Sequence, residues 1–181
     1  MRLIYYFTFK IDVIPSGDEP EYLTIANNFF VTNILSLKDY IIRRAPLASI
    51  VLAPFLQLFG NHENIARLAN VLISSTIPPT LFFIVKTQFN YNKKESIIIA
   101  LIYSLYPPAI FYSSMIQSET LAALLMLICF YHLIKFKNDN KFKNAMILGI
   151  SFGLLSLTRS SNYYLIFILI PIIYYLEKQR K

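Results

Sequence analysis

The stretch Ser118 to Phe136, SETLAALLMLICFYHLIKF, decides the fold class of this chain. A helix needs about 20 apolar residues to cross the hydrocarbon core of a bilayer, and spans of about 17 occur. The charged side chains of this run, Glu119 and Lys135, lie near its two ends. The run therefore predicts a transmembrane helix.

Further apolar runs predict more spans. Ser96 to Tyr112 is long enough to cross but is broken by Pro107 and Pro108. The remaining runs are Ile65 to Val85, Asn144 to Thr158 and Tyr163 to Leu176.

The run from Asn144 to Thr158 is short, but it contains Gly149 and Gly153. This small-xxx-small spacing is typical of membrane helices that approach a neighbour closely. The alternative is that the two glycines are incidental.

The composition is that of a membrane protein. Of 181 residues, 56% are hydrophobic and 15% are charged, against about 25% charged residues in a soluble domain. The formal net charge is +7, but the basic residues lie in short loops between apolar runs, so no nucleic-acid partner is expected. The sequence has no GxGxxG, P-loop, HExxH or CxxC pattern, and its one cysteine, Cys129, lies in an apolar run. Soluble nucleotide chemistry is therefore not expected either.

Lysines indicate which loops face the cytoplasm. Nine of the eleven lysines fall within residues 86–94, 135–143 and 178–181. With these regions inside, the chain is predicted to be an all-α, polytopic bundle of about six spans in the plasma membrane. Residues 1–15 form the weakest span, because Lys10 and Asp12 interrupt it. Residues 1–181 are expected to form a single membrane domain whose first long loop, residues 16–64, is extracytoplasmic.

This first outer loop is predicted to hold two short helices. Apolar side chains recur on one helical face over residues 22–37, with Asn27 and Asn28 opposite them. Leu47 to Phe59 is a second apolar piece that is too short to span. We expect both helices to lie on the outer membrane surface.

Arginines are distributed differently from lysines. Four of the six arginines fall on the predicted outer side. Because a planar guanidinium binds phosphate or carboxylate in two places, they predict an anionic ligand there. The alternative is a solvated loop pair and two side chains that reach water from helix ends. The four are Arg43, Arg44, Arg67 and Arg159.

The acidic residues of the loop lie in GDEPEY, residues 17–22. Asp18 and Glu21 have the spacing of a capping box and Pro20 suits a first helical turn, so helix capping is one explanation of the cluster. Glu119 opens an apolar helix, where a carboxylate either offsets the helix dipole or serves a function. His62 and His132 are far apart in sequence, and each is expected to be structural.

Five motifs, GDEPEY, RRAPL, NHENIARLANVL, IFYSSMIQSETL and GLLSLTR, occur in this order and cover nearly the whole chain. In this order they resemble the N-terminal part of polytopic glycosyltransferases of the GT-C fold, in the branch of protein O-mannosyltransferases and aminoarabinose transferases. The chain departs from the family pattern at Ala45 and Ala48, in place of an RRPPLY-like stretch, and at Ser160, where proline often follows LTR. The resemblance implies a hexosyl- or pentosyltransferase that moves a sugar from a polyprenyl-phosphate carrier to an acceptor on the outer side of the membrane.

The resemblance and the arginine distribution together predict seven site residues. In the family, an acid in the first outer loop acts as general base or positions the acceptor. A sugar on a lipid phosphate has an anionic leaving group, which needs cations, while a carboxylate takes the acceptor proton. The predicted set is Asp18 and Glu19 as catalytic acids, Arg43, Arg44, Arg67 and Arg159 as ligands of the donor phosphate, and Glu119 as a substrate-binding residue.

The expected partners are the polyprenyl-phosphate sugar and the lipid bilayer. No nucleotide or redox cofactor is implied. A divalent metal stays an open alternative, because an Asp and a Glu are too few ligands to argue for or against one. Complete family members are longer, so the second hypothesis is a truncated, non-catalytic membrane protein that binds lipid-linked sugar or joins a second membrane subunit or separate C-terminal half. A transporter is disfavoured because the charged residues lie at helix ends.

Overall fold

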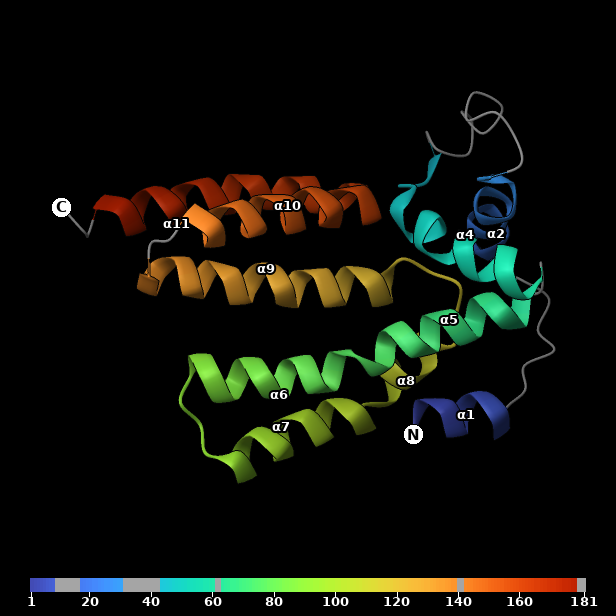
Figure 1. The fold of residues 1–181 in the computed structure, drawn as a ribbon, viewed down its shortest axis with the longest axis horizontal. Coiled ribbons are helices and arrows are strands. Elements are labelled where there is room, and N and C mark those ends of the chain that lie inside the picture. The colour runs from blue at the N-terminus through green and yellow to red at the C-terminus, as the bar shows by residue number, and fades with distance from the viewer. Residues whose placement is uncertain (9–16, 31–42, 61–62, 140–141, 179–181) are drawn as a thin grey trace.

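A computed structural model describes residues 1–8, 17–30, 43–60, 63–139 and 142–178, and in these ranges the chain forms helices and no strand (Figure 1). This confirms the predicted all-α class. In chain order the helices are α1 (Arg2–Thr8), α2 (Glu19–Asn28), α4 (Leu47–Phe59), α5 (Glu63–Ser75), α6 (Ile77–Gln88), α7 (Lys93–Leu105), α8 (Pro107–Ser113), α9 (Glu119–Asp139), α10 (Phe142–Thr158), η2 (Ser160–Leu165) and α11 (Ile166–Lys178).

Two helical stretches in the described ranges are long and apolar enough to cross a bilayer. One is Glu63–Gln88, where α6 continues from α5, and the other is α9. The pair α7 and α8 passes the same test together but is bent by 59°. The helices α4 and α10 and residues Ser160–Tyr175 are shorter and apolar. These helices confirm a membrane fold, and the number of six spans stays a prediction.

Prolines explain why one of these helices continues and another bends. Pro78 and Pro79 fall in the first turn of α6, where a missing N–H costs no helical hydrogen bond. Pro107 and Pro108 also begin a helix, but the residue before them, Tyr106, has extended backbone (φ −65°, ψ 113°) because the proline ring disfavours the helical conformation there. The predicted break at these prolines is confirmed.

The helices pack as an elongated bundle with two different ends (Figure 1). Helix α9 packs along α10 on one side and α6 on the other, and α7 lies against α6. The α6–α7 turn, the C-terminal end of α9, the N-terminal end of α10 and the C-terminal end of α11 lie at one end of the bundle. Lysines of the lysine-rich regions belong to these helix ends, among them Lys86, Lys137 and Lys143. At the other end, α2 and α4 pack together near the start of α9 and the end of α10.

The buried core is centred at this second end. Leu52 and Leu56 of α4, Ala66 of α5 and Ile116 before α9 are each at most 3% exposed. Helix α4 has the bounds predicted for the second loop helix. Helix α2 confirms the first loop helix as far as Asn28. The predicted continuation is wrong at Phe29 and Phe30, which form a turn, and residues 31–37 lie outside the described residues.

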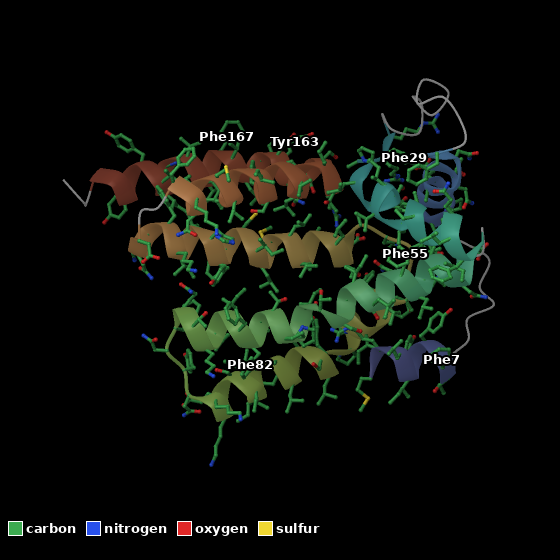
Figure 2. The ribbon with its side chains drawn as sticks, in the orientation of Figure 1. Phe7, Phe29, Phe55, Phe82, Tyr163 and Phe167 are labelled. Carbon is green, nitrogen blue, oxygen red and sulfur yellow. The ribbon has the colours of Figure 1, made fainter. Side chains whose placement is uncertain are left out.

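Away from this core, the long helices present large apolar side chains outward (Figure 2). Phe83 of α6, Ile102 of α7, Ile150 of α10 and Phe167 of α11 are 51–73% exposed. An apolar surface of this kind suits contact with lipid or with another membrane helix.

Gly149 and Gly153 lie on the exposed surface of α10. A Cβ built on either one meets no atom within 4 Å, so within the described ranges the predicted close helix contact is not found. His132 Nδ1 is 3.3 Å from Asn144 Oδ1, which joins α9 to α10 in keeping with a structural role. His62 lies outside the described residues.

Candidate functional site

The N-terminus of α2 carries the acids of the GDEPEY motif. Gly17 turns the chain into the helix with φ +63°, a conformation that suits glycine. Asp18 occupies the N-cap position, but its side chain makes no capping hydrogen bond, so the predicted capping box does not form. The Asp18 and Glu21 side chains are bound by an arginine instead.

That arginine is Arg44. Its Nη2 donates to Asp18 Oδ1, and its Nε donates to Glu21 Oε2 at 2.6 Å. Hydrogen bonding to Glu21 raises the pKa of Arg44, so the guanidinium stays charged. Arg43 is 70% exposed, with its Nη1 4.0 Å from Glu21 Oε1. Two arginines therefore lie near Asp18, of which Arg44 is ion-paired with it and Arg43 is largely exposed to solvent.

Glu19 is the neighbour of Asp18 but lies in a different environment. Its carboxylate accepts from both terminal nitrogens of Arg67, at 3.0 and 2.9 Å, and both side chains are 4% exposed. Glu19 Oε1 also accepts from the backbone N–H of Ile116 at 2.8 Å, and Arg67 Nη1 donates to the Ser114 carbonyl at 3.0 Å. This ion pair thus joins α2, α5 and the segment that leads into α9.

Asn70, one turn after Arg67 on α5, holds the same segment. Its Nδ2 donates to the Met115 carbonyl at 2.6 Å and lies 3.3 Å from both the Ser113 carbonyl and Thr120 Oγ1. Asn70 is 3% exposed. Hydrogen bonds from polar side chains of α5 therefore hold residues 113–120 in place, and this segment includes Glu119.

Glu119 pairs with Arg159 across the ends of α9 and α10. Arg159 Nη1 donates to Glu119 Oε1 at 3.0 Å, and the side chains are 50% and 39% exposed, respectively. Arg159 lies in extended backbone between α10 and η2, which lets its side chain reach the start of α9.

These groups surround one pocket of about 190 Å³. Five of the seven predicted site residues line it, while Glu19 and Arg67 lie outside it as the buried pair. Its wall is formed by Asp18, Tyr22, Arg43, Arg44, Ala45, Ser118, Glu119, Thr158, Arg159, Ser160 and Ser161.

Several hydroxyl groups of this wall were not predicted from the sequence. Ser118 precedes Glu119, and Ser160 and Ser161 follow Arg159. The sequence could have indicated these serines, because they lie next to Glu119 and Arg159, which were predicted as site residues. Tyr22 was assigned only to the apolar face of its helix, although it also lines the pocket.

In the part of the chain that the structure covers, no group of three His, Cys, Asp or Glu side chains is placed to hold a metal ion. The acids of the pocket are instead paired with arginines. This arrangement favours a ligand that brings its own negative charge, such as a phosphate, because such a ligand can exchange with the carboxylates.

Comparison with known proteins identifies the family of this chain. Residues 43–181 match the family described as dolichyl-phosphate-mannose-protein mannosyltransferase, so Arg43, Arg44, Glu119 and Arg159 lie inside the match and Asp18 precedes it. No curated protein matches the chain, and no solved structure matches it. The family is one of membrane glycosyltransferases of the GT-C type that use a lipid-linked sugar donor. The family match covers most of the chain, which therefore belongs to the dolichyl-phosphate-mannose-protein mannosyltransferase family.

Proposed function

We propose that this chain acts in a membrane glycosyltransferase that moves a sugar, mannose in the first instance, from a polyprenyl-phosphate carrier to a hydroxyl acceptor on the extracytoplasmic face. The observation that carries the proposal is the pocket in which Asp18 and Glu119 lie among three arginines. Family membership supports the class of donor.

In the proposed reaction, the acceptor oxygen attacks the anomeric carbon while the bond from that carbon to the phosphate oxygen breaks. Asp18 takes the proton of the acceptor hydroxyl, and the carrier leaves as a lipid phosphate. Arg44 and Arg159 stabilise the negative charge that develops on the phosphate. A positioned base of this kind contributes about 10²- to 10⁴-fold in rate.

The ion pairs of the pocket suit such a donor. A phosphate presents several oxygens to the planar guanidinium and binds it in two places. If the donor phosphate binds the Arg44 guanidinium, Asp18 Oδ1 no longer accepts the hydrogen bond from Arg44 Nη2. The donor would thereby free the base that the reaction needs.

Glu119 and the hydroxyl groups of Ser118, Ser160 and Ser161 also line the wall. We assign them to the hydroxyl groups of the sugar or the acceptor, because a carboxylate accepts hydrogen bonds from such groups and a hydroxyl both accepts and donates them. Glu19 and Arg67 are assigned a positioning role, since both carboxylate oxygens of Glu19 and both terminal nitrogens of Arg67 are bound to each other, and the pair also binds the Ser114 carbonyl and the Ile116 N–H.

The arrangement of the bundle supports our proposal that the pocket faces the extracytoplasmic side of the membrane. The pocket lies at the end opposite the α6–α7 turn. Lys86, Lys93 and Lys94 flank this turn, and such an excess of lysine marks the cytoplasmic side.

The test uses the full chain in lipid nanodiscs with undecaprenyl-phosphate mannose as the probe. Arg44→Gln combined with Arg159→Gln should weaken binding by about tenfold or more, since charge-assisted hydrogen bonds are lost. The matched control, Lys86→Gln with Lys143→Gln, removes two positive charges at the opposite end and should bind as the natural chain does.

Mannose release to a serine-containing peptide in the same nanodiscs tests the catalytic part. Donor binding without transfer would assign the chain to the second hypothesis, a lipid-linked-sugar binder that works with another membrane subunit. Equal binding by both double variants would reject the pocket as the phosphate site.

A further inference from the structure

Asn162 does not line the pocket, but it holds the turn that carries Arg159. Its side-chain Nδ2 donates to the Leu155 carbonyl of α10 at 3.3 Å. Its backbone N–H donates to the Arg159 carbonyl at 3.0 Å, and the Arg159 N–H donates to the same Leu155 carbonyl at 3.2 Å. Asn162 therefore ties the first turn of η2 to the last turn of α10, with Arg159 between them.

The backbone of Arg159 needs such support. It is extended, with φ −152° and ψ 120°, although the residues before it are helical. Residues 158–165, TRSSNYYL, contain no glycine and no proline, the two residue types that most often end a helix. An asparagine side chain that hydrogen-bonds to the backbone competes with helix formation. The interruption at Arg159 therefore depends on the hydrogen bonds of Asn162.

The ion pair between Arg159 and Glu119 does not supply this support. The two side chains are 50% and 39% exposed, and pairs this exposed contribute little to stability. In the proposed reaction Arg159 also exchanges Glu119 for the donor phosphate. The hydrogen bonds of Asn162 involve neither group, so they persist through this exchange.

We infer that Asn162 is a positioning residue for sugar transfer, which fixes the backbone of Arg159 so that its guanidinium stays at the pocket when Glu119 is exchanged for phosphate. This rests on the proposed function and adds a residue that acts through Arg159. A cation that is already in place stabilises the charge that develops on the phosphate without any reorganisation.

Asn162→Ala removes the side-chain donor and tests the inference. Transfer from undecaprenyl-phosphate mannose by the full chain in nanodiscs should fall by about tenfold or more, since displacing a catalytic group by about 1 Å can cost about 10²-fold. The loss should lie in kcat, with the KM for the donor changed by less than about threefold, because the phosphate charge develops in the transition state. Tyr163→Ala is the matched control, because Tyr163 is the next residue of η2, is 53% exposed and does not line the pocket.

A proline at position 160 should replace the function of Asn162. Proline restrains the preceding residue to extended backbone with ψ of about +120 to +160°, which includes the ψ of 120° at Arg159. Ser160 is the first residue of η2, where a missing N–H costs no helical hydrogen bond.

Because Ser160 lines the pocket, Ser160→Ala, which loses the same hydroxyl, is the reference for Ser160→Pro. Adding Asn162→Ala should reduce transfer by about tenfold or more in the Ser160→Ala background. In the Ser160→Pro background the further loss should stay within about twofold.

A second measurement does not depend on activity. Trypsin cleaves after arginine, so the rate of cleavage after Arg159, followed by mass spectrometry in nanodiscs, reports how often this turn opens. Asn162→Ala should accelerate this cleavage by about threefold to tenfold, the effect of one hydrogen bond on a local opening equilibrium. Tyr163→Ala should leave the rate unchanged.

The outcomes separate the inference from the proposed function. Unchanged cleavage after Arg159 in Asn162→Ala, or equal losses of transfer in the two position-160 backgrounds, would overturn the inference while the proposed function stands. A loss that appears in KM alone would do the same. If the natural chain transfers no mannose, the proposed function fails and the inference fails with it, whatever the cleavage rate.

Discussion

Asp18 and Glu19 are adjacent in the chain, yet the structure gives their carboxylates different partners. Asp18 is 45% exposed, lines the pocket and is bound by Arg44, while Glu19 is 4% exposed and bound by Arg67. Successive residues of a helix point about 100° apart, so neighbours at its start face different surroundings. Replacing Asp18 and replacing Glu19 are therefore expected to have different effects on the protein.

At Asp18, the expected loss is catalytic. Asp18→Asn keeps the size of the side chain but removes the base, so sugar transfer should fall by about 10²- to 10⁴-fold. Transfer from undecaprenyl-phosphate mannose to a peptide hydroxyl measures this. Glu21→Gln removes another partner of Arg44 without lining the pocket and should cost less than about tenfold. Near-normal turnover of Asp18→Asn would remove Asp18 from the mechanism.

At Glu19, the expected loss is in stability. Glu19→Gln leaves the Arg67 charge buried without a counter-ion, which should lower the free energy of unfolding by about 3–5 kcal/mol. Denaturant unfolding in detergent micelles measures the change. Glu119→Gln breaks a pair that is partly exposed and should cost at most about 1 kcal/mol.

A double variant separates charge burial from lost packing at this position. Glu19→Leu with Arg67→Leu removes both charges, and it should regain part of the lost stability because no buried charge remains. The regain is partial because the Ile116 N–H and the Ser114 carbonyl lose their partners. Losses of similar size for Glu19→Gln and Glu119→Gln would contradict the buried pair.

At the scale of elements, α5 determines where α9 begins. Arg67 and Asn70 bind the backbone carbonyls of residues 113–115, and this segment carries the chain from the bent pair α7 and α8 into Glu119. The position of the Glu119–Arg159 pair therefore depends on side chains of a helix that does not line the pocket.

Asn70→Ala tests this dependence. It leaves the Met115 carbonyl and its neighbours without their donor, so it should cost about 1–3 kcal/mol of stability and also reduce transfer. The matched change, Asn92→Ala, removes the capping box of α7 at about 1 kcal/mol, and should leave transfer unchanged because it lies at the other end of the bundle. Equal activity of the two variants would argue against a positioning role for α5.

At the scale of the whole molecule, the bundle separates two kinds of basic residue. The lysine-rich turns lie at one end, and the arginines of the pocket lie at the other. Under the positive-inside rule this predicts that the lysine end faces the cytoplasm.

Cysteine labelling tests that orientation. In a Cys129→Ser background, which has no other cysteine, Ser161→Cys should react with a membrane-impermeant maleimide in intact cells. Asn90→Cys should react only after the membrane is permeabilised. Both positions are exposed in the structure, so the reverse pattern would place the pocket on the cytoplasmic side.

The sequence by itself determined the features that depend on local composition and backbone sterics. Apolar runs predicted the long helices, Leu47–Phe59 was predicted with its observed bounds, and Pro107 and Pro108 predicted the bend. Each follows from residues close together in the chain, because lengths of apolar sequence and proline restrictions act locally.

Only the tertiary structure decided which charges meet. The Asp18–Arg44, Glu119–Arg159 and Glu19–Arg67 pairs join residues 26, 40 and 48 positions apart. The sequence predicted these residues as one set, and the fold divides them into a pocket and a buried pair. The physical reason is that an ion pair depends on distance and burial. Both are set by how α2, α5, α9 and α10 pack together, which no single segment of the chain encodes.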